Sequence, residues 1–159
     1  MSYIGSLHLS NGLPHGLGLL IDSKNNYTYI GNFDNGRRHG FGKMQTDSYT
    51  YIGEWSQNKR TGYGFYYTKS GYYIGDWNND QKSGVGISQS KNLEIRAIWE
   101  DNKPYSICIV RKVGSQELKC ALFVEEKIEY VSTDPNKLNH KFSSISVIKY
   151  LQQSKKILN

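Results

Sequence analysis

The chain has 159 residues, of which 37% are hydrophobic, and a formal net charge of +6 at pH 7, so its length indicates one compact domain or a small array with an appendage. No stretch approaches the ~18 consecutive apolar residues of a membrane-spanning helix, the N-terminus lacks a signal-peptide pattern, and two cysteines cannot build a disulfide framework or a four-thiolate zinc site. Sixteen glycines and thirteen tyrosines beside three prolines are typical of short strands joined by tight turns.

A Tyr-Ile-Gly motif recurs with a period of 22 residues, starting at Tyr29, Tyr51 and Tyr73. Each copy continues with an aromatic residue two positions after the glycine and with a later Gly-x-Gly pair. A looser copy precedes these three and carries a two-residue insertion before its own Gly-x-Gly at residues 16–18. Repetition at a fixed period is the signature of a repeat array, and the sequence predicts about four copies.

The period weakens toward the C-terminus. The next step of 22 residues lands on Ile95, Ala97 and Trp99, which we interpret as a degenerate half-repeat because no Gly-x-Gly follows. After Lys103-Pro104 the period stops. We therefore expect a repeat array over residues 1–103 and a C-terminal unit over residues 104–159.

Within each copy the side-chain pattern has a period of two, which is the period of a β-strand. The turn after the first strand of a copy is predicted at Asp34 to Arg38, where Asn35 and Gly36 supply left-handed backbone conformations. Successive hairpins should pair into one long antiparallel sheet with no helix in residues 20–100. The predicted strands cover residues 27–34, 41–46, 49–56, 63–68, 71–78, 85–90 and 93–100.

The run Tyr-x-Gly-x-aromatic, then Asn-Gly, then His-Gly-x-Gly at residues 29–42 resembles the MORN (membrane occupation and recognition nexus) repeat. The next two copies depart from it, because Asn58 and Asp80 replace the turn glycine and Thr61 and Ser83 replace the histidine. The resemblance implies a mostly β fold, an open antiparallel β-meander. It also implies a protein-binding or scaffolding module that occasionally attaches to membranes or membrane-associated structures, without chemistry of its own.

Stacked copies should align a glycine column between two aromatic columns, which leaves a furrow over bare backbone. The rings either fill that furrow as the thin core of the array or line a concave groove that takes the helix or peptide of a protein partner. The opposite face, with Thr28, Ile30 and Asn32, is expected to be solvated with a modest apolar stripe, and a second partner surface is the alternative. The candidate partner-binding residues are Tyr29, Phe33, Tyr51, Trp55, Tyr73, Trp77 and Trp99, and the groove glycines are Gly31, Gly53 and Gly75.

The sequence of the array shows no pattern that is typical of a metal, cofactor or nucleic-acid site. His15 and His39 lie in separate hairpins without further ligands at metal-site spacing, and the Gly-x-Gly pairs lack the strand-to-helix context of a dinucleotide site. Residues 1–103 carry 11 basic and 9 acidic residues, so binding of nucleic acid is not expected. No cofactor, no metal and no catalytic residue is predicted.

The C-terminal unit should contain a hairpin and a short α-helix. The hairpin covers residues 106–113 and 118–124, with Cys108 and Cys120 interpreted as buried thiols on its two arms. The helix begins at Ser143 or Ser144 and runs to residue 156, although a short strand over residues 144–148 competes with it. This helix either caps the last hairpin, docks a partner or second copy, or contacts anionic lipid. Its candidate lipid contacts are Lys141, Lys149, Lys155 and Lys156.

The predicted function is therefore a non-catalytic adaptor or scaffold that binds a protein partner along the aromatic–glycine face. The alternative is a peripheral membrane tether that binds anionic lipid through the basic C-terminal segment. The 56 residues after Lys103 are too few for the kinase or methyltransferase domains that follow some MORN arrays. A cytoplasmic location is expected, with membrane or cytoskeleton association and homo-oligomerisation left open.

Overall fold

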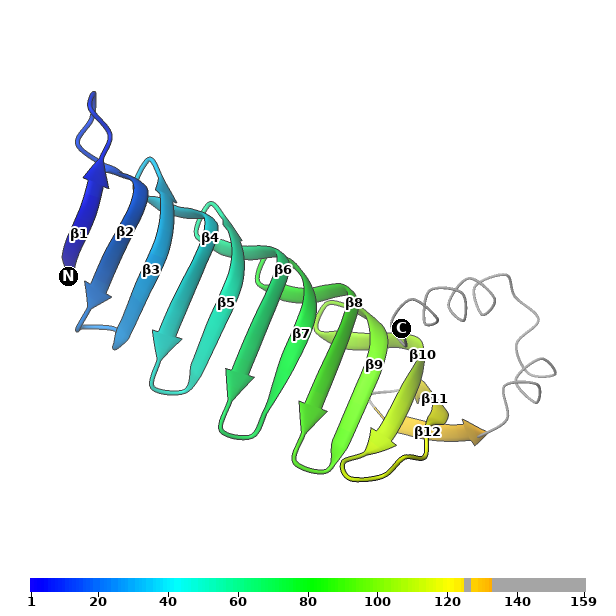
Figure 1. The fold of residues 1–159 in the computed structure, drawn as a ribbon. Coiled ribbons are helices and arrows are strands. Elements are labelled where there is room, and N and C mark those ends of the chain that lie inside the picture. Colours follow the sequence, from blue (N-terminus) through cyan, green and yellow to red (C-terminus); the bar gives the residue numbers. More distant parts are fainter. Residues whose placement is uncertain (125–126, 133–159) are drawn as a thin grey trace.

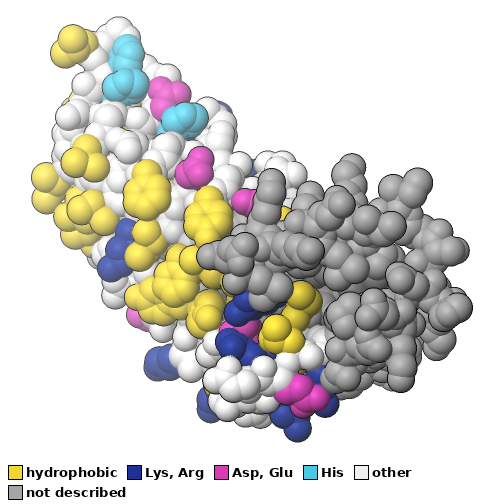
Figure 2. Space-filling view, turned by 45° about the vertical axis from the view of Figure 1, so that its right-hand side comes forward, with side chains coloured by type: hydrophobic (Ala, Val, Ile, Leu, Met, Phe, Trp, Pro, Cys, Tyr) yellow, Lys and Arg dark blue, Asp and Glu magenta, His cyan; other side chains and the backbone are white. Residues whose placement is uncertain are grey.

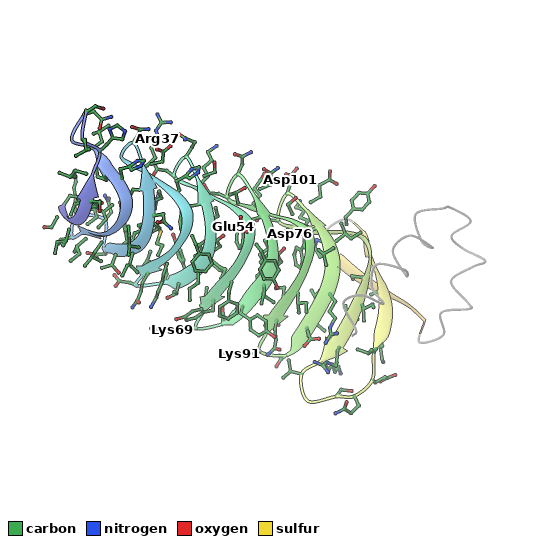
Figure 3. The ribbon with its side chains drawn as sticks, turned by 45° about the horizontal axis from the view of Figure 1, so that its top comes forward. Arg37, Glu54, Lys69, Asp76, Lys91 and Asp101 are labelled. Atoms are coloured by element: carbon green, nitrogen blue, oxygen red, sulfur yellow. The ribbon has the colours of Figure 1, made fainter. Side chains whose placement is uncertain are left out.

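The computed structural model describes residues 1–124 and 127–132, which form one antiparallel sheet whose twelve strands lie side by side in chain order (Figure 1). The described part of the chain contains no helix. The sheet is a single layer, and its strands are arched along their length (Figure 3). The strands are β1 (Ser2–Leu7), β2 (Pro14–Asp22), β3 (Tyr27–Asp34), β4 (Arg37–Thr46), β5 (Tyr49–Ser56), β6 (Lys59–Thr68), β7 (Gly71–Asn78), β8 (Gln81–Ser90), β9 (Leu93–Glu100), β10 (Lys103–Lys112), β11 (Lys119–Val124) and β12 (Lys127–Ser132).

The predicted open β-meander is confirmed, and the first strand of each copy has its predicted bounds. The second strands, β4, β6 and β8, begin four residues earlier than predicted. The reason is a two-residue turn such as Asn35-Gly36, where both residues have positive φ (47° and 79°). Such turns match the right-handed twist of the flanking strands. The polar residues that follow the turn therefore already belong to the second strand.

Neighbouring hairpins are joined at these turns by reciprocal hydrogen bonds. The backbone N–H of Asn58 donates to the carbonyl oxygen of Arg38 (3.0 Å), and the backbone N–H of Arg38 donates to Oδ1 of Asn58 (2.9 Å). The same pair of bonds links Asp80 to Arg60 (3.1 and 3.0 Å). The departures from the turn glycine at these positions thus supply an acceptor that glycine lacks.

The copy that carries glycine confirms this interpretation. Gly36 donates its backbone N–H to the carbonyl oxygen of Pro14 (2.8 Å). Proline has no N–H to donate in return, so a side-chain acceptor at position 36 would have no partner there. Glycine is the residue that the left-handed turn position accepts most readily.

The predicted half-repeat is a complete fifth hairpin, which corrects the sequence interpretation. Strands β9 and β10 pair with the register of the earlier copies, and Ala97 and Cys108 occupy the two glycine positions. Ile95 stands where the earlier copies have tyrosine. The sheet then continues through β11 and β12 without a break, so the expected boundary after residue 103 falls at the first residue of β10.

The C-terminal hairpin is present as β10 and β11, whereas β12 was not predicted. In the β10–β11 register Cys108 pairs with Ala121 and Ile109 with Cys120, so the two cysteines are not cross-strand partners. Cys108 is buried, as expected. The predicted helix over residues 143–156, the competing strand over 144–148 and the four candidate lysines lie outside the described residues.

Candidate functional site

The aromatic–glycine face of the sheet is a ring core. The seven predicted contact side chains are 0–5% exposed, and Tyr29, Tyr51 and Tyr73 are fully buried. The three hydroxyls donate to the carbonyl oxygens of Asn32, Glu54 and Asp76 at 2.9, 3.0 and 3.0 Å, each three residues along the same strand. Each phenol is therefore held across its own strand at the position where the glycine has no side chain.

The glycine furrow is filled by these phenol rings. A Cβ added at Gly53 would lie 2.6 Å from Oη of Tyr51 and 2.6 Å from Cα of Gly64. One added at Gly64 would lie 2.4 Å from the same Oη. Gly31 and Gly75 are occupied in the same way by Tyr29 and Tyr73. The furrow over these glycines is thus filled by the chain's own rings.

Edge-to-face contacts join the rings into one chain across the copies. The ring centroid of Trp55 lies 5.4 Å from that of Tyr29 and 5.1 Å from that of Tyr51, with interplanar angles of 86° and 90°. This is a favourable geometry for aromatic pairs. The same alternation continues through Trp77 and Tyr73 to Trp99.

Cationic side chains cover the outer edge of the ring core. Arg38 lies 4.6 Å from the centroid of Trp55, Arg60 lies 4.4 Å from that of Trp77, and Lys82 lies 4.8 Å from that of Trp99. Burial lowers the pKa of both Arg38 and Lys82, and burial raises the pKa of the Tyr29 phenol to about 12. The contacts support the interpretation as a core, and a partner role for the seven rings stays a prediction.

The open face, defined as the side of the sheet opposite these rings, exposes apolar side chains in a regular row. The residue between the two glycines of each Gly-x-Gly pair points there, because side chains alternate between the faces of a strand. Leu17, Phe41 and Tyr63 are 65%, 59% and 55% exposed, and Val85 is half-buried. Figure 2 shows hydrophobic side chains gathered in a band over the surface, with acidic side chains beside them.

Carboxylates stand opposite two of these four apolar residues on the neighbouring strand. Phe41 pairs across the sheet with Glu54, and Tyr63 pairs with Asp76. Glu54 accepts the backbone N–H of Tyr63 at 2.9 Å, and Asp76 accepts that of Val85 at 3.0 Å, so both carboxylates are held in place. We call the row the open-face ladder; its members are Leu17, Asn32, Phe41, Glu54, Tyr63, Asp76, Val85 and Ile98.

The open-face ladder lies between the two sides of the sheet along which the turns connect the strands. Figure 3 shows Glu54 and Asp76 on the arched strands. They lie between one row of turns, marked by Arg37 and Asp101, and the opposite row, marked by Lys69 and Lys91. A second apolar row runs beside the ladder on the same face, through paired residues of adjacent strands. It contains Ile30, Ile52, Phe65, Ile74 and Ile87, interrupted by Lys43. This row is the apolar stripe that the sequence predicted.

The ladder itself was not predicted, although its signal was in the sequence. The residue between two glycines must face away from them on an extended strand. Counting from Gly40 and Gly42 therefore puts Phe41 on the open face, and the same count applies to Leu17, Tyr63 and Val85. The predictions from the sequence assign faces only to the first strand of each copy.

At β9 the open face becomes charged. Glu94 is buried and accepts hydrogen bonds from Arg96 (2.8 Å) and Arg111 (2.6 Å). Burial alone would raise the pKa of this carboxyl, but the two guanidinium groups outweigh it and hold the pKa below its ordinary value. Both carboxylate oxygens are thus occupied by this network, which makes Glu94 a structural group rather than a site for a ligand.

The remaining site predictions concern histidines, metals and membranes. Nδ1 of His15 lies 3.4 Å from Oδ1 of Asp34, and the His8 ring contacts that of His15. Within residues 1–124 and 127–132, no three His, Cys, Asp or Glu side chains gather as metal ligands. The same residues include no helix long and apolar enough to cross a membrane.

Comparison with known families gives one result. A family model for the MORN repeat matches four segments, residues 8–27, 29–50, 51–71 and 73–92, which together make up just over half of the chain. The matched segments cover β2 through β8 except for Thr28 in β3 and Tyr72 in β7. No curated protein matches the chain.

Proposed function

The chain belongs to the MORN-repeat family, and from this premise we propose that it is a non-catalytic adaptor that binds a protein partner on its open face. MORN repeats are protein- and membrane-binding modules and a non-catalytic type of repeat. The adaptor role, the helical or extended form of the partner segment and a cytoplasmic location are parts of this proposal.

The exposed apolar residues of the open-face ladder carry the proposal. Large side chains that stand on one face of a sheet at regular spacing are unlike the scattered apolar residues of an ordinary surface. Phe41 and Tyr63 are more than half exposed, and aromatic residues are favoured as anchors in protein interfaces. The paired carboxylates of Glu54 and Asp76 add fixed polar groups that give such an interface orientation.

We place the partner on the open face because its apolar side chains are exposed, whereas the rings of the aromatic–glycine face are almost fully buried. Tyr51 and Trp55 are 0% and 3% exposed, and their phenol and indole groups already contact each other and the strand beneath. Their contribution to binding is to hold the sheet in the shape that presents the ladder.

The membrane tether stays the alternative function. Its four lysines lie outside the described residues, so support for it rests on the absence of acidic residues from 135–159. Sedimentation with anionic vesicles tests it, because electrostatic attachment fades as salt is raised. Salt-sensitive binding that disappears when Lys149, Lys155 and Lys156 are replaced by glutamine would favour the tether.

The adaptor proposal is tested by affinity capture with the full chain. We expect the Phe41→Ser/Tyr63→Ser variant to lose at least one protein that the wild-type chain captures from its native extract. The matched control is Leu9→Ser/Val113→Ser, which removes exposed apolar residues that do not belong to the ladder. Identical capture by all three chains would contradict the proposal.

A further inference from the structure

The middle of the open-face ladder alternates between apolar and acidic side chains. Its members on the successive strands β4 to β8 are, in order, Phe41, Glu54, Tyr63, Asp76 and Val85. Adjacent strands are about 4.8 Å apart, so the apolar side chains recur about every 9.6 Å and a carboxylate stands halfway between them. A partner segment that lies across these strands has to present its own side chains at the same spacing.

The halfway position selects the backbone form of such a segment. In an α-helix, side chains three or four residues apart lie on one face and are about 4.5–6 Å apart along the axis, which is close to one strand spacing. Side chains on one face of a β-strand are about 6.6 Å apart. Those of a polyproline II helix are about 9.3 Å apart, with none on that face between them. Of these three forms, only the α-helix places a side chain opposite each member of the ladder.

The two carboxylates favour a cation on that helix. Glu54 is exposed and Asp76 is half-buried, and neither forms an ion pair with another described residue. Glu94 on the same face differs, because Arg96 and Arg111 already bind it. Each of the two carboxylates accepts one backbone N–H of the neighbouring strand. A carboxylate accepts several hydrogen bonds on its two oxygens, so both can also accept from a lysine or arginine.

The apolar members of the ladder set the spacing of the remaining contacts. Phe41 and Tyr63 are more than half exposed, and Val85 is half-buried. Residues seven positions apart on a helix are about 10.5 Å apart along its axis, against about 9.6 Å on the ladder. Over the two intervals from Phe41 to Val85 the difference adds up to about 1.8 Å, which side-chain rotamers accommodate. A helix of about fifteen residues therefore spans all three apolar positions.

We propose that the partner segment is a basic amphipathic α-helix that lies across β4 to β8. It carries apolar residues seven positions apart, which contact Phe41, Tyr63 and Val85. A lysine or arginine between successive apolar residues binds Glu54 or Asp76. The inference rests on the proposed function and names the chemistry of its partner. An anionic lipid surface does not fit this site, because it would bring negative charge to the two carboxylates.

A synthetic helix tests this chemistry with the full chain. The probe is an alanine- and glutamine-rich peptide of about 22 residues, with a leucine at every seventh position and a lysine four residues after each of the first two leucines. Its counterpart carries glutamate in place of both lysines. We expect the wild-type chain to bind the lysine probe about tenfold more tightly in fluorescence anisotropy, because attraction at two exposed ion pairs is replaced by repulsion.

Two variants of the chain locate the preference on the ladder. Glu54→Gln/Asp76→Asn removes both charges and keeps an acceptor for each backbone N–H, so the two probes should bind it within about twofold of each other. The matched control is Asp47→Asn/Asp101→Asn, which removes two carboxylates from turns. This control should keep the preference of the wild-type chain for the lysine probe.

A third probe tests the backbone form. It is a proline-rich peptide of the same length with leucine at every third position, which matches the apolar spacing but places no side chain opposite the carboxylates. We expect it to bind the wild-type chain more weakly than the lysine probe. Tighter binding of the proline-rich probe would overturn the inference, because the site would then take an extended partner.

The inference would also be overturned if the wild-type chain bound the lysine and glutamate probes equally or bound neither. The same result follows if Glu54→Gln/Asp76→Asn keeps the wild-type preference. Such a failure leaves the adaptor proposal standing, because capture through Phe41 and Tyr63 does not depend on the form or charge of the partner. Conversely, if the lysine probe binds as expected but capture does not depend on Phe41 and Tyr63, the site has this chemistry and the adaptor proposal fails.

Discussion

The two faces of this sheet use the same kinds of residue for opposite purposes. Tyr51 and Tyr63 lie twelve residues apart in one hairpin, yet the first is fully buried and the second is 55% exposed. The difference is their relation to glycine. Tyr51 lies on the same side as Gly53 and covers it, whereas Tyr63 stands between Gly62 and Gly64 and points away from the ring core.

The comparison shows how a single-layer sheet makes a core. One face supplies bare backbone at the glycines, and large rings lie against it, so the rings are covered by the strand itself and by their neighbours. The exposed apolar residues of the open-face ladder contribute nothing to this core. Substitutions on the aromatic–glycine face should therefore change stability, and those on the open face should change binding.

The largest loss is expected for Trp55→Ala. This change removes the indole between Tyr29 and Tyr51 and its hydrogen bond from Nε1 to the carbonyl oxygen of Gly42. It also removes the ring that the Arg38 guanidinium contacts. Truncation of a buried tryptophan costs about 3–5 kcal/mol. Urea unfolding measures it, and a loss below about 1 kcal/mol would show that the rings do not form the core.

The second-largest loss of stability is expected at alkaline pH, where a buried tyrosine of the ring core ionises. The folded pKa of Tyr29 is raised to about 12 by burial, whereas an exposed tyrosine titrates near 10. The stabilisation is therefore fully present below pH 10 and is lost as the pH rises toward 12, at roughly 3 kcal/mol for this group.

Thermal unfolding between pH 8 and pH 12 measures this dependence. The midpoint should stay level up to about pH 10 and then fall. The Tyr29→Phe variant cannot ionise at this position, so its midpoint should fall less steeply. A midpoint that falls equally in both chains would mean that Tyr29 contributes nothing to the alkaline loss.

A smaller loss is expected for Gly53→Val, at roughly 1–3 kcal/mol, the usual range for overpacking. The new side chain would meet Oη of Tyr51 and the backbone of Gly64. Ser70→Val at an exposed turn is the control and should change the free energy of unfolding by less than about 0.5 kcal/mol. Equal melting temperatures of the two variants would show that the glycine column is not packed.

The smallest loss in the free energy of unfolding, about 1–2 kcal/mol, is expected for Asp80→Ala in the turn between β7 and β8. The change removes the acceptor of the Arg60 backbone and side-chain N–H groups, and it places alanine at a φ of 70°. Asp80→Asn keeps both the acceptor and the tolerance of that φ, so it should retain most of the stability. Chemical unfolding compares the two, and equal losses would contradict the proposed role of the acceptor.

Much of the fold follows from the period of 22 residues, because a repeated hairpin admits few other arrangements. The faces of β3, β5 and β7 follow from alternation around Gly31, Gly53 and Gly75. The starts of the second strands did not follow, because polar residues after the turn resemble turn residues. Arg38 and Arg60 in fact belong to the second strands, where they pair with Phe33 and Trp55.

The fifth hairpin shows why the motif alone understated the array. Ile95 replaces the tyrosine, and Ala97 and Cys108 replace the two glycines that a phenol would cover. Isoleucine is smaller than tyrosine, and the side chains of Ala97 and Cys108 are fully buried at the two glycine positions. Each column taken by itself shows only the loss of the glycines.

The separation of the two faces is the central claim, and the free energies of unfolding of Tyr51→Ser and Tyr63→Ser test it most directly. The two variants make the same chemical change in the same hairpin, on opposite faces. We predict a loss of about 3–5 kcal/mol for Tyr51→Ser and of no more than about 0.5 kcal/mol for Tyr63→Ser. Equal losses in the two variants would contradict the account, because Tyr63 would then belong to the core.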